Sequence, residues 1–206
     1  MITDADRARI ADAIRAAEAR TSGEIFCVLA RSAGGYRLVP VAWAAALALI
    51  VPLPLIYLSE WGPTTIYVVQ LIAFTLAAIG LSQPALRLRI VPRRRKRERA
   101  HAAAMRQFLA QGMQKTEGRT GVLIFVSVAE RHAEILADAG IARKVPDQVW
   151  DDAVRVLIAG IAVGRAAEGF VTAIGQCAAV LSEHFPPGAI NRNELPNAII
   201  ELSPLG

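Results

Sequence analysis

Two long runs without a charged side chain constrain this chain more than any other feature of its sequence. Residues 38–58 and 64–86 contain no Asp, Glu, Lys or Arg. About 20 apolar residues are enough for a helix to cross the hydrocarbon core of a bilayer, and runs this apolar are unusual in buried core helices. We therefore predict two membrane-spanning helices over these ranges. Pro40, Pro52 and Pro54 are expected to bend or shorten the first.

Positive charge is concentrated directly after the second run. The whole chain has a net charge of +5, yet residues 87–99 alone carry eight Arg or Lys side chains and one acid. The turn between the two runs has no Lys or Arg. Because basic residues next to membrane spans stay in the cytoplasm, we predict a two-pass inner-membrane protein. Both termini and the soluble part are then cytoplasmic.

These basic residues are typical of a membrane surface rather than of a nucleic-acid interface. Each basic group near anionic headgroups contributes about 1 kcal/mol to membrane binding. The remainder of the chain is close to neutral, so the basicity does not spread over a folded face and no nucleic-acid partner is expected. The predicted lipid-facing strip consists of Arg93, Arg94, Arg95, Lys96, Arg97 and Arg99.

The first soluble stretch predicts a helix followed by a strand. Thr3 and Asp6 have the spacing of an N-terminal cap, and apolar residues then recur at helical spacing from Ile10 to Ala17. Residues 24–30, "EIFCVLA", are β-branched and apolar, which is typical of a buried strand.

The second soluble stretch predicts a helix, a strand hairpin and two further helices. The expected strands cover 122–128 and 133–140, and the later helices cover 150–161 and 170–185. The polar and then apolar tail is expected to form an edge strand or an extended arm. The apolar stripe predicted for the first of these helices is Met105, Phe108, Leu109, Gly112 and Met113.

This order of elements predicts an α/β sandwich with a small mixed sheet flanked by helices. The apolar helical hairpin is inserted into the crossover between the first two strands. The predicted organisation is a first arm over 1–37, the hairpin over 38–86, the basic strip over 87–99 and the remainder of the domain with its tail over 100–206.

Three segments together resemble the TPM-domain family: "AAEARTSGEIFCVLA", "RTGVLIFVSVAERHAEILADAGI" and "GFVTAIGQCAAVL". This family is also called TPM phosphatase and includes photosystem II repair proteins. The resemblance implies an α/β sandwich and, for some members, divalent-metal binding with weak acid phosphatase activity. The two-span insertion is similar to a bacterial membrane-anchored subgroup. Many members work outside the cytoplasm, so the predicted orientation departs from them.

The resemblance places the family's metal ligands in acidic loops after the central strands. The matching acids here are Asp138 and Asp147, and Asp151 and Asp152 follow a turn later, so that these carboxylates could together hold calcium or magnesium. Arg143 and Lys144 stand where the family usually carries another acid after the glycine that matches Gly140. We therefore expect no cofactor, with calcium or magnesium as the alternative. Acids in the first turn of a helix are also favoured by its dipole, so a structural role is open.

No catalytic motif is evident. His101, His132 and His184 lie far apart in the sequence, and no glycine-rich phosphate loop is present. If 132–138 is a strand, then His132, Glu134 and Asp138 share one face, which either binds a metal or faces solvent. Cys27 and Cys177 are expected to be buried and reduced.

The sequence therefore predicts a membrane-anchored, non-catalytic interaction, assembly or accessory module. Its expected partners are anionic lipids and another membrane protein or complex. The alternative is a metal-dependent phosphatase of the family type with weak activity, in which Arg119 or Arg143 faces the phosphate.

Overall fold

The structure is a computed structural model of the 206-residue chain, and it describes all residues except 1, 37, 117, 188–193 and 204–206. It contains two compact units. Residues 1–34 and 97–206 form the first, which we call the folded unit, and residues 35–96 form the second, which we call the hairpin unit.

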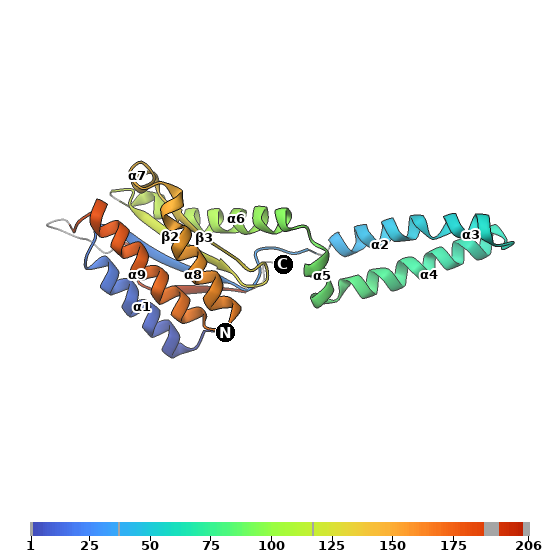
Figure 1. The fold of residues 1–206 in the computed structure, drawn as a ribbon, viewed down its shortest axis with the longest axis horizontal. Helices are drawn as coiled ribbons and strands as arrows, with labels where there is room; N and C mark the ends of the chain where they lie inside the picture. The colour runs from blue at the N-terminus through green and yellow to red at the C-terminus, as the bar shows by residue number, and fades with distance from the viewer. Residues whose placement is uncertain (1, 37, 117, 188–193, 204–206) are drawn as a thin grey trace. The chain divides into compact units, whose positions relative to one another are not determined.

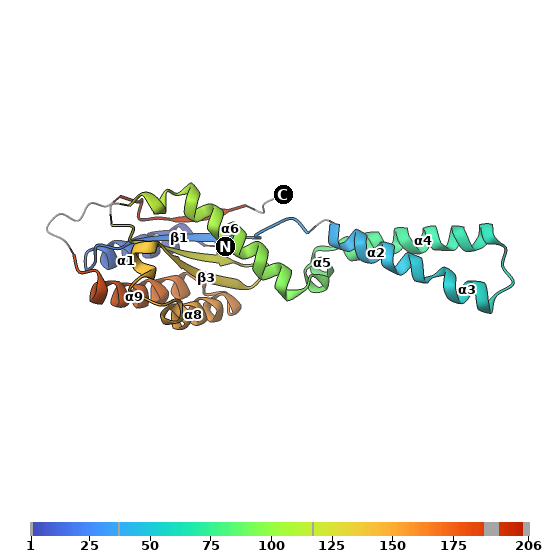
Figure 2. The same ribbon diagram turned by 90° about the horizontal axis from the view of Figure 1, so that it is seen from above.

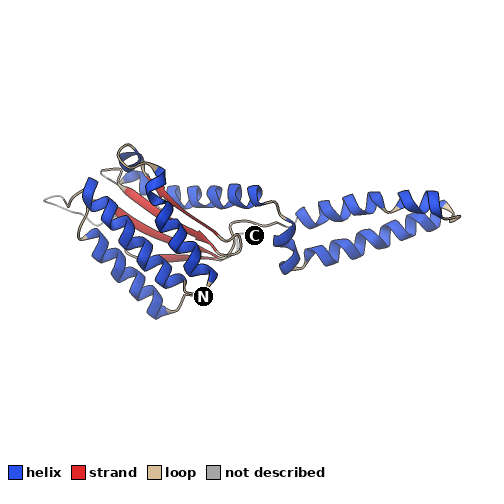
Figure 3. Cartoon of the chain, in the orientation of Figure 1, coloured by secondary structure: helices blue, strands red, loops and turns tan. Residues whose placement is uncertain are grey.

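A mixed four-stranded sheet with the order β3-β2-β1-β4 forms the centre of the folded unit (Figures 1 and 3). β1 (Glu24–Ala30) lies between β2 (Gly121–Ser127) and β4 (Ile199–Leu202), parallel to both. β3 (His132–Ala137) forms an antiparallel hairpin with β2. Every residue of β1 and β2 is buried, as expected for strands covered on both faces. Within the tail, β4 is an edge strand, which was one of the two forms that the sequence allowed.

Helices cover both faces of this sheet. Figure 2 shows α6 on one face and α1, α8 and α9 on the other. Side chains of β1 alternate between the two layers, so Ile25 and Cys27 pack with the three-helix side and Phe26 and Val28 pack with α6. The predicted α/β sandwich is confirmed. The helical elements outside the hairpin are α1 Asp4–Glu18, α6 Arg93–Ala110, η1 Met113–Lys115, α7 Ala139–Ala142, η2 Asp147–Trp150, α8 Asp151–Ala162 and α9 Ala166–His184.

The start of α1 follows the predicted cap. The Asp6 backbone N–H donates to the Thr3 hydroxyl at 3.2 Å, and the Thr3 N–H donates to the Asp6 carboxylate at 3.1 Å. This reciprocal pair satisfies two N–H groups that the helix itself leaves without partners.

The apolar stripe predicted for α6 is wrong in phase. Met105 and Leu109 are 40% and 54% exposed, although Phe108 and Met113 are buried as expected. The face against the sheet is built instead on Ala100, Ala103, Ala104 and Phe108. Alanine carries only a methyl group, which lets α6 approach the sheet closely but barely marks a hydrophobic period in the sequence.

Within the hairpin unit, prolines divide the apolar runs. α2 (Leu38–Ile50) is followed by α3 (Pro52–Leu58), and α4 (Pro63–Ser82) is followed by α5 (Pro84–Ile90). The second apolar run is therefore not a single helix that extends to residue 86. Pro84 disfavours the helical conformation for Gln83, the residue before it. Leu38–Leu58 and Pro63–Ser82 are long and apolar enough to cross a membrane. α2 packs along α4 and buries Pro40, Ala44 and Ala48.

A buried acid lies where α1 ends and β1 begins. The Glu18 carboxylate accepts a hydrogen bond from the Ile25 N–H at 3.1 Å. Burial raises the pKa of Glu18 to about 7, and the charge of Glu24 nearby adds to the rise, whereas Ile25 and Asn197 oppose it. Glu24 in turn accepts from the Leu195 N–H at 3.2 Å, so these two acids connect β1 with the segment that leads into β4.

We predict that the Glu18→Gln variant alters the pH dependence of stability. Between pH 4.5 and about 7 the folded state retains a proton on Glu18 that the unfolded chain releases, so wild-type stability falls as pH rises through this range. The amide of the variant does not titrate. The free energy of unfolding of the variant minus that of wild type should therefore rise by about 3 kcal/mol between pH 4.5 and pH 8. Thermal unfolding of both full-length proteins in mild detergent from pH 4.5 to 8 measures this. A difference that stays constant with pH would contradict the prediction.

Candidate functional site

One buried carboxylate holds the segment through which the chain leaves the folded unit after β1. Glu130 is 8% exposed and lies in the turn after β2. Its oxygens accept hydrogen bonds from the Ala33 N–H, at 3.2 Å to each oxygen, from the Ser32 hydroxyl at 3.1 Å and from the Ser127 hydroxyl. Because Ser127 pairs with Ala30 at the carboxyl ends of β1 and β2, the turn after β2 lies beside the exit of β1.

A second carboxylate holds the segment by which the chain returns. His101 of α6 and Glu134 of β3 form a hydrogen bond of 2.9 Å between Nδ1 and Oε2. His132 Nε2 lies 3.7 Å from the other oxygen of Glu134, an ion-pair separation. Burial by itself would raise the pKa of Glu134, but His132 and His101 beside it outweigh that effect and hold the pKa below its ordinary value.

The histidines are therefore less scattered than their sequence positions indicate. His101 and His132 meet at Glu134, whereas His184 ends α9 on the opposite face of the sheet. His132 and Glu134 share a face of β3, as their alternation predicted. Sequence reasoning missed His101, because only the packing of α6 on the sheet places it beside β3.

The exit and return segments lie next to each other. A Cβ atom on Gly34 would stand 3.2 Å from the flexible side chain of Arg99, so the two segments approach each other closely. Two acids thus hold both connections of the folded unit at one edge of the sheet. We call this group the connection cluster, and it consists of Ser32, Ala33, His101, Ser127, Glu130 and Glu134.

The three acids predicted as metal ligands are not brought together. Asp138 is 4% exposed, caps α7 through the Ala139 N–H at 2.6 Å, and accepts two hydrogen bonds from Arg119 at 3.1 and 3.2 Å. Asp147 begins η2 and Asp151 begins α8, and both are exposed. Among the described residues no group of three or more His, Cys, Asp or Glu side chains is arranged to hold a metal ion.

Gly140 has a packing role at the same corner. A Cβ atom there would lie 2.5 Å from the carbonyl oxygens of Gly118 and Arg119, so only glycine allows α7 to approach this loop. Lys144, which stands where an acid was expected, lies 4.7 Å above the ring of Phe185 in a cation–π contact.

A cavity of about 280 Å³ opens near the carboxyl ends of β1 and β2 on the three-helix side. Its lining includes Leu29 and Val128 together with charged side chains from α1 and from the start of α9. These charges are paired within the wall, with Arg9 3.9 Å from Asp6 and Arg165 3.4 Å from Glu168. The cavity therefore presents a balanced rather than a strongly charged surface.

Comparison with known proteins agrees with this architecture. Residues 82–180 match the family model for the TPM domain. This range is 99 residues, just under half of the 206-residue chain. The match begins at the end of α4, so α1 and β1 lie outside it although they complete the same folded unit. The resemblance to the TPM-domain family is confirmed.

A solved structure has the same fold. It is the NMR structure of BA42 protein from the psychrophilic bacterium Bizionia argentinensis, with a TM-score of 0.61 and 23% identity over 98% of this chain and 95% of that chain. At this identity the likeness establishes the fold alone. No curated protein matches the chain.

We predict that Glu130→Gln destabilises the folded unit. The amide offers one acceptor oxygen and turns N–H groups toward the donors of Ser32, Ala33 and Ser127, which should cost about 1–3 kcal/mol. Thermal unfolding of the full-length protein should show a melting temperature lower by about 3–10 °C.

The matched control is Glu183→Gln, which changes an exposed acid on α9 in the same way. It should leave the melting temperature nearly unchanged. Equal melting of the two variants would show that the Glu130 carboxylate does not stabilise the exit segment.

Proposed function

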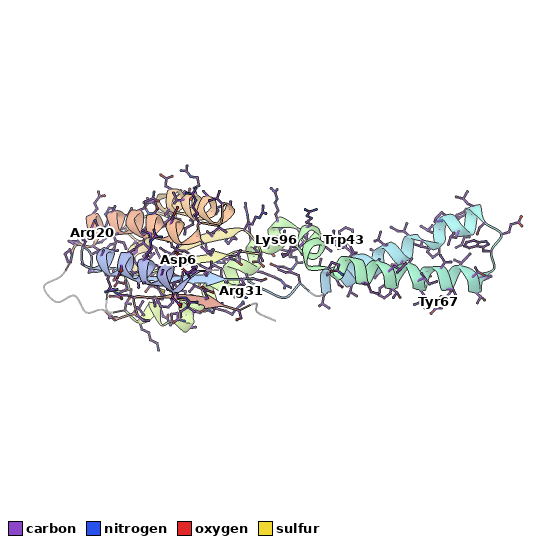
Figure 4. All side chains as sticks on the ribbon, turned by 90° about the horizontal axis from the view of Figure 1, so that it is seen from below. Asp6, Arg20, Arg31, Trp43, Tyr67 and Lys96 are labelled. Atoms are coloured by element: carbon purple, nitrogen blue, oxygen red, sulfur yellow. The ribbon has the colours of Figure 1, made fainter. Side chains whose placement is uncertain are left out.

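We propose that this TPM-domain protein is anchored in the inner membrane by its hairpin unit and acts there as a non-catalytic interaction, assembly or accessory module. The observation that carries the proposal is the exposure of the two apolar helices. No residue of α4 is buried, and large apolar side chains such as Trp43 and Tyr67 stand out from the hairpin (Figure 4). Apolar surface in water costs about 25 cal/mol per Å², which favours placing these helices in lipid.

The charge distribution supports a cytoplasmic folded unit. Of the predicted strip, Arg93, Arg94, Arg95, Arg97 and Arg99 are exposed, and Lys96 is partly exposed. They form the first two turns of α6, directly after the hairpin. The turn between α3 and α4 contains no basic residue, so the positive-inside bias favours placing that turn on the far side. Anionic headgroups are then the partners of the strip.

The chemistry of the acids supports a module rather than an enzyme. Glu130 and Glu134 hold the chain connections, and Asp138 is engaged with Arg119 and with the start of α7. These carboxylates have defined structural partners. An accessory role also requires a protein partner, for which a membrane protein or complex is the proposed class.

The alternative function is a metal-dependent phosphatase with weak activity. It would require Asp138 to exchange its ion pair with Arg119 for a metal ion, with Asp147 and Asp151 moving toward it. Phosphate release from the full-length protein that depends on calcium or magnesium would favour this alternative over the accessory module.

We predict a two-pass topology with both termini in the cytoplasm. In intact cells, a membrane-impermeant thiol reagent should label Glu60→Cys, in the turn between the spans, but not Arg143→Cys in the folded unit until the cells are permeabilised. The native Cys27 and Cys177 are fully buried, so they should contribute little background. Labelling of Arg143→Cys alone in intact cells would place the folded unit outside.

We also predict that the basic strip binds anionic lipid. Replacing Arg93, Arg94, Arg95 and Lys96 by Gln removes four positive charges, each of which contributes about 1 kcal/mol near an anionic surface. The full-length variant, purified in mild detergent, should retain less anionic lipid and keep the melting temperature of the folded unit. Both preparations should lack nucleic acid by their absorbance ratio.

The control removes the same charge from exposed positions outside the strip: Arg20, Arg106, Arg143 and Arg155, each replaced by Gln. Equal loss of lipid from the two variants would mean that net charge, rather than the strip, retains it. Nucleic acid that only the strip variant loses would replace lipid with nucleic acid as the partner.

A further inference from the structure

The two spans contain a single side-chain amide, that of Gln70 in α4. It lies seven residues after Pro63 in a 20-residue helix, which places it about 10 Å along an axis of about 30 Å. In the proposed orientation this depth is within the hydrocarbon region of the bilayer. An amide there has no water to bind, so an absent partner costs free energy.

Two other polar side chains of α4 are satisfied by their own helix. The Thr75 hydroxyl donates to the Leu71 carbonyl at 2.9 Å, and the Ser82 hydroxyl donates to the Ala78 carbonyl at 2.6 Å. Within the part of the chain that the structure describes, Gln70 forms no hydrogen bond through its side chain. Its donor and acceptor groups are therefore available to a group outside the hairpin.

Gln70 lines a groove between α2 and α4. The groove has a volume of about 290 Å³, and its α2 wall includes the small side chains of Ala45 and Ala48. Small residues allow the backbone of another helix to approach closely, which is the usual packing in membranes. The remaining lining residues are Leu49, Tyr67, Leu71 and Phe74.

We propose that this groove is the contact surface between two copies of the chain, joined by their Gln70 side chains across a two-fold axis. A carboxamide both donates and accepts, so it is complementary to itself. In a two-fold interface each residue meets the same region of the other copy, so one amide in each copy is enough to satisfy both. This inference rests on the proposed insertion of the hairpin unit into a membrane.

A second copy of the chain can both fill the groove and bind the Gln70 amide, whereas lipid can only fill the groove. An acyl chain fills the apolar volume but offers no donor or acceptor to Gln70, so the amide would still lack a partner. A helix of a different protein would need its own polar side chain at the same depth. The second copy always supplies one.

The experiment measures energy transfer between copies in vesicles. Full-length protein carrying Glu60→Cys is labelled with donor or acceptor dye at this exposed position, since the native cysteines are buried, and reconstituted over a range of lipid-to-protein ratios. Energy transfer between the dyes should indicate a dimer, and it should fall as added lipid dilutes the protein and the dimer dissociates. Adding Gln70→Leu should weaken association about 3- to 30-fold, because interhelical hydrogen bonds in membranes have modest strength.

Thr75→Val is the matched control, because it removes a polar group of the same helix that already has an internal partner. It should leave association unchanged. A wild-type protein that stays monomeric at every ratio, or a dimer that Gln70→Leu does not weaken, would overturn the proposal.

Disulfide trapping gives an independent measurement of the contact face. Leu71 lines the groove, and the exposed Leu76 lies about 140° around α4 from it at 100° per residue. Leu71→Cys should form a cross-linked dimer under mild oxidation, whereas Leu76→Cys should not. The reverse pattern would place the contact on the opposite face.

An alkaline wash of cell membranes separates this inference from the proposed function. Release of the chain by the wash would show that the hairpin unit does not anchor it in the membrane, which would contradict both proposals. A chain that stays in the membrane but is monomeric in vesicles would contradict only the proposed dimer.

Discussion

The parallel pairing of β1 with β2 joins two parts of the chain that the hairpin unit separates. Seven residues of each strand pair in register from Glu24 with Gly121 to Ala30 with Ser127, and all of them are buried. Both helical layers pack on this pair. Loop closure becomes only slowly more costly as a loop grows, so a long insertion is tolerated. The insertion also forms its own compact unit, in which α2 contacts both α4 and α5.

Buried or half-buried carboxylates stabilise the points where the chain changes direction. Glu130 holds the exit from β1, Glu134 holds the start of the return through α6, and Asp138 holds the turn from β3 into α7. Glu18 acts similarly at the other end of β1, where burial raises its pKa. Glu18 and Glu130 satisfy backbone N–H groups that would otherwise be buried without partners, whereas Glu134 binds the exposed ring of His101. This shared structural use of acids is what favours a module over a catalyst in the proposed function.

Much of the fold was predictable because it depends on local pattern. The bounds of β1 agree with the prediction, and the cap formed by Thr3 and Asp6 agrees as well. The face of α6 was not predictable from its large apolar residues, because Ala100, Ala103 and Ala104 form the contact while Met105 and Leu109 remain exposed. Periodicity arguments rely on large side chains, and this helix packs through small ones.

By itself the sequence determined the apolar hairpin, the position of the basic strip and the two central strands, since each follows from composition or alternation over neighbouring residues. Only the tertiary structure decided which side chains meet. His101 and Glu134 are 33 positions apart, and Ala33 and Glu130 are 97 apart, yet both pairs form hydrogen bonds. Asp138, Asp147 and Asp151 are close in sequence but do not gather into a metal site. The physical reason is that side-chain contacts depend on how helices pack against the sheet, which no local window of residues specifies.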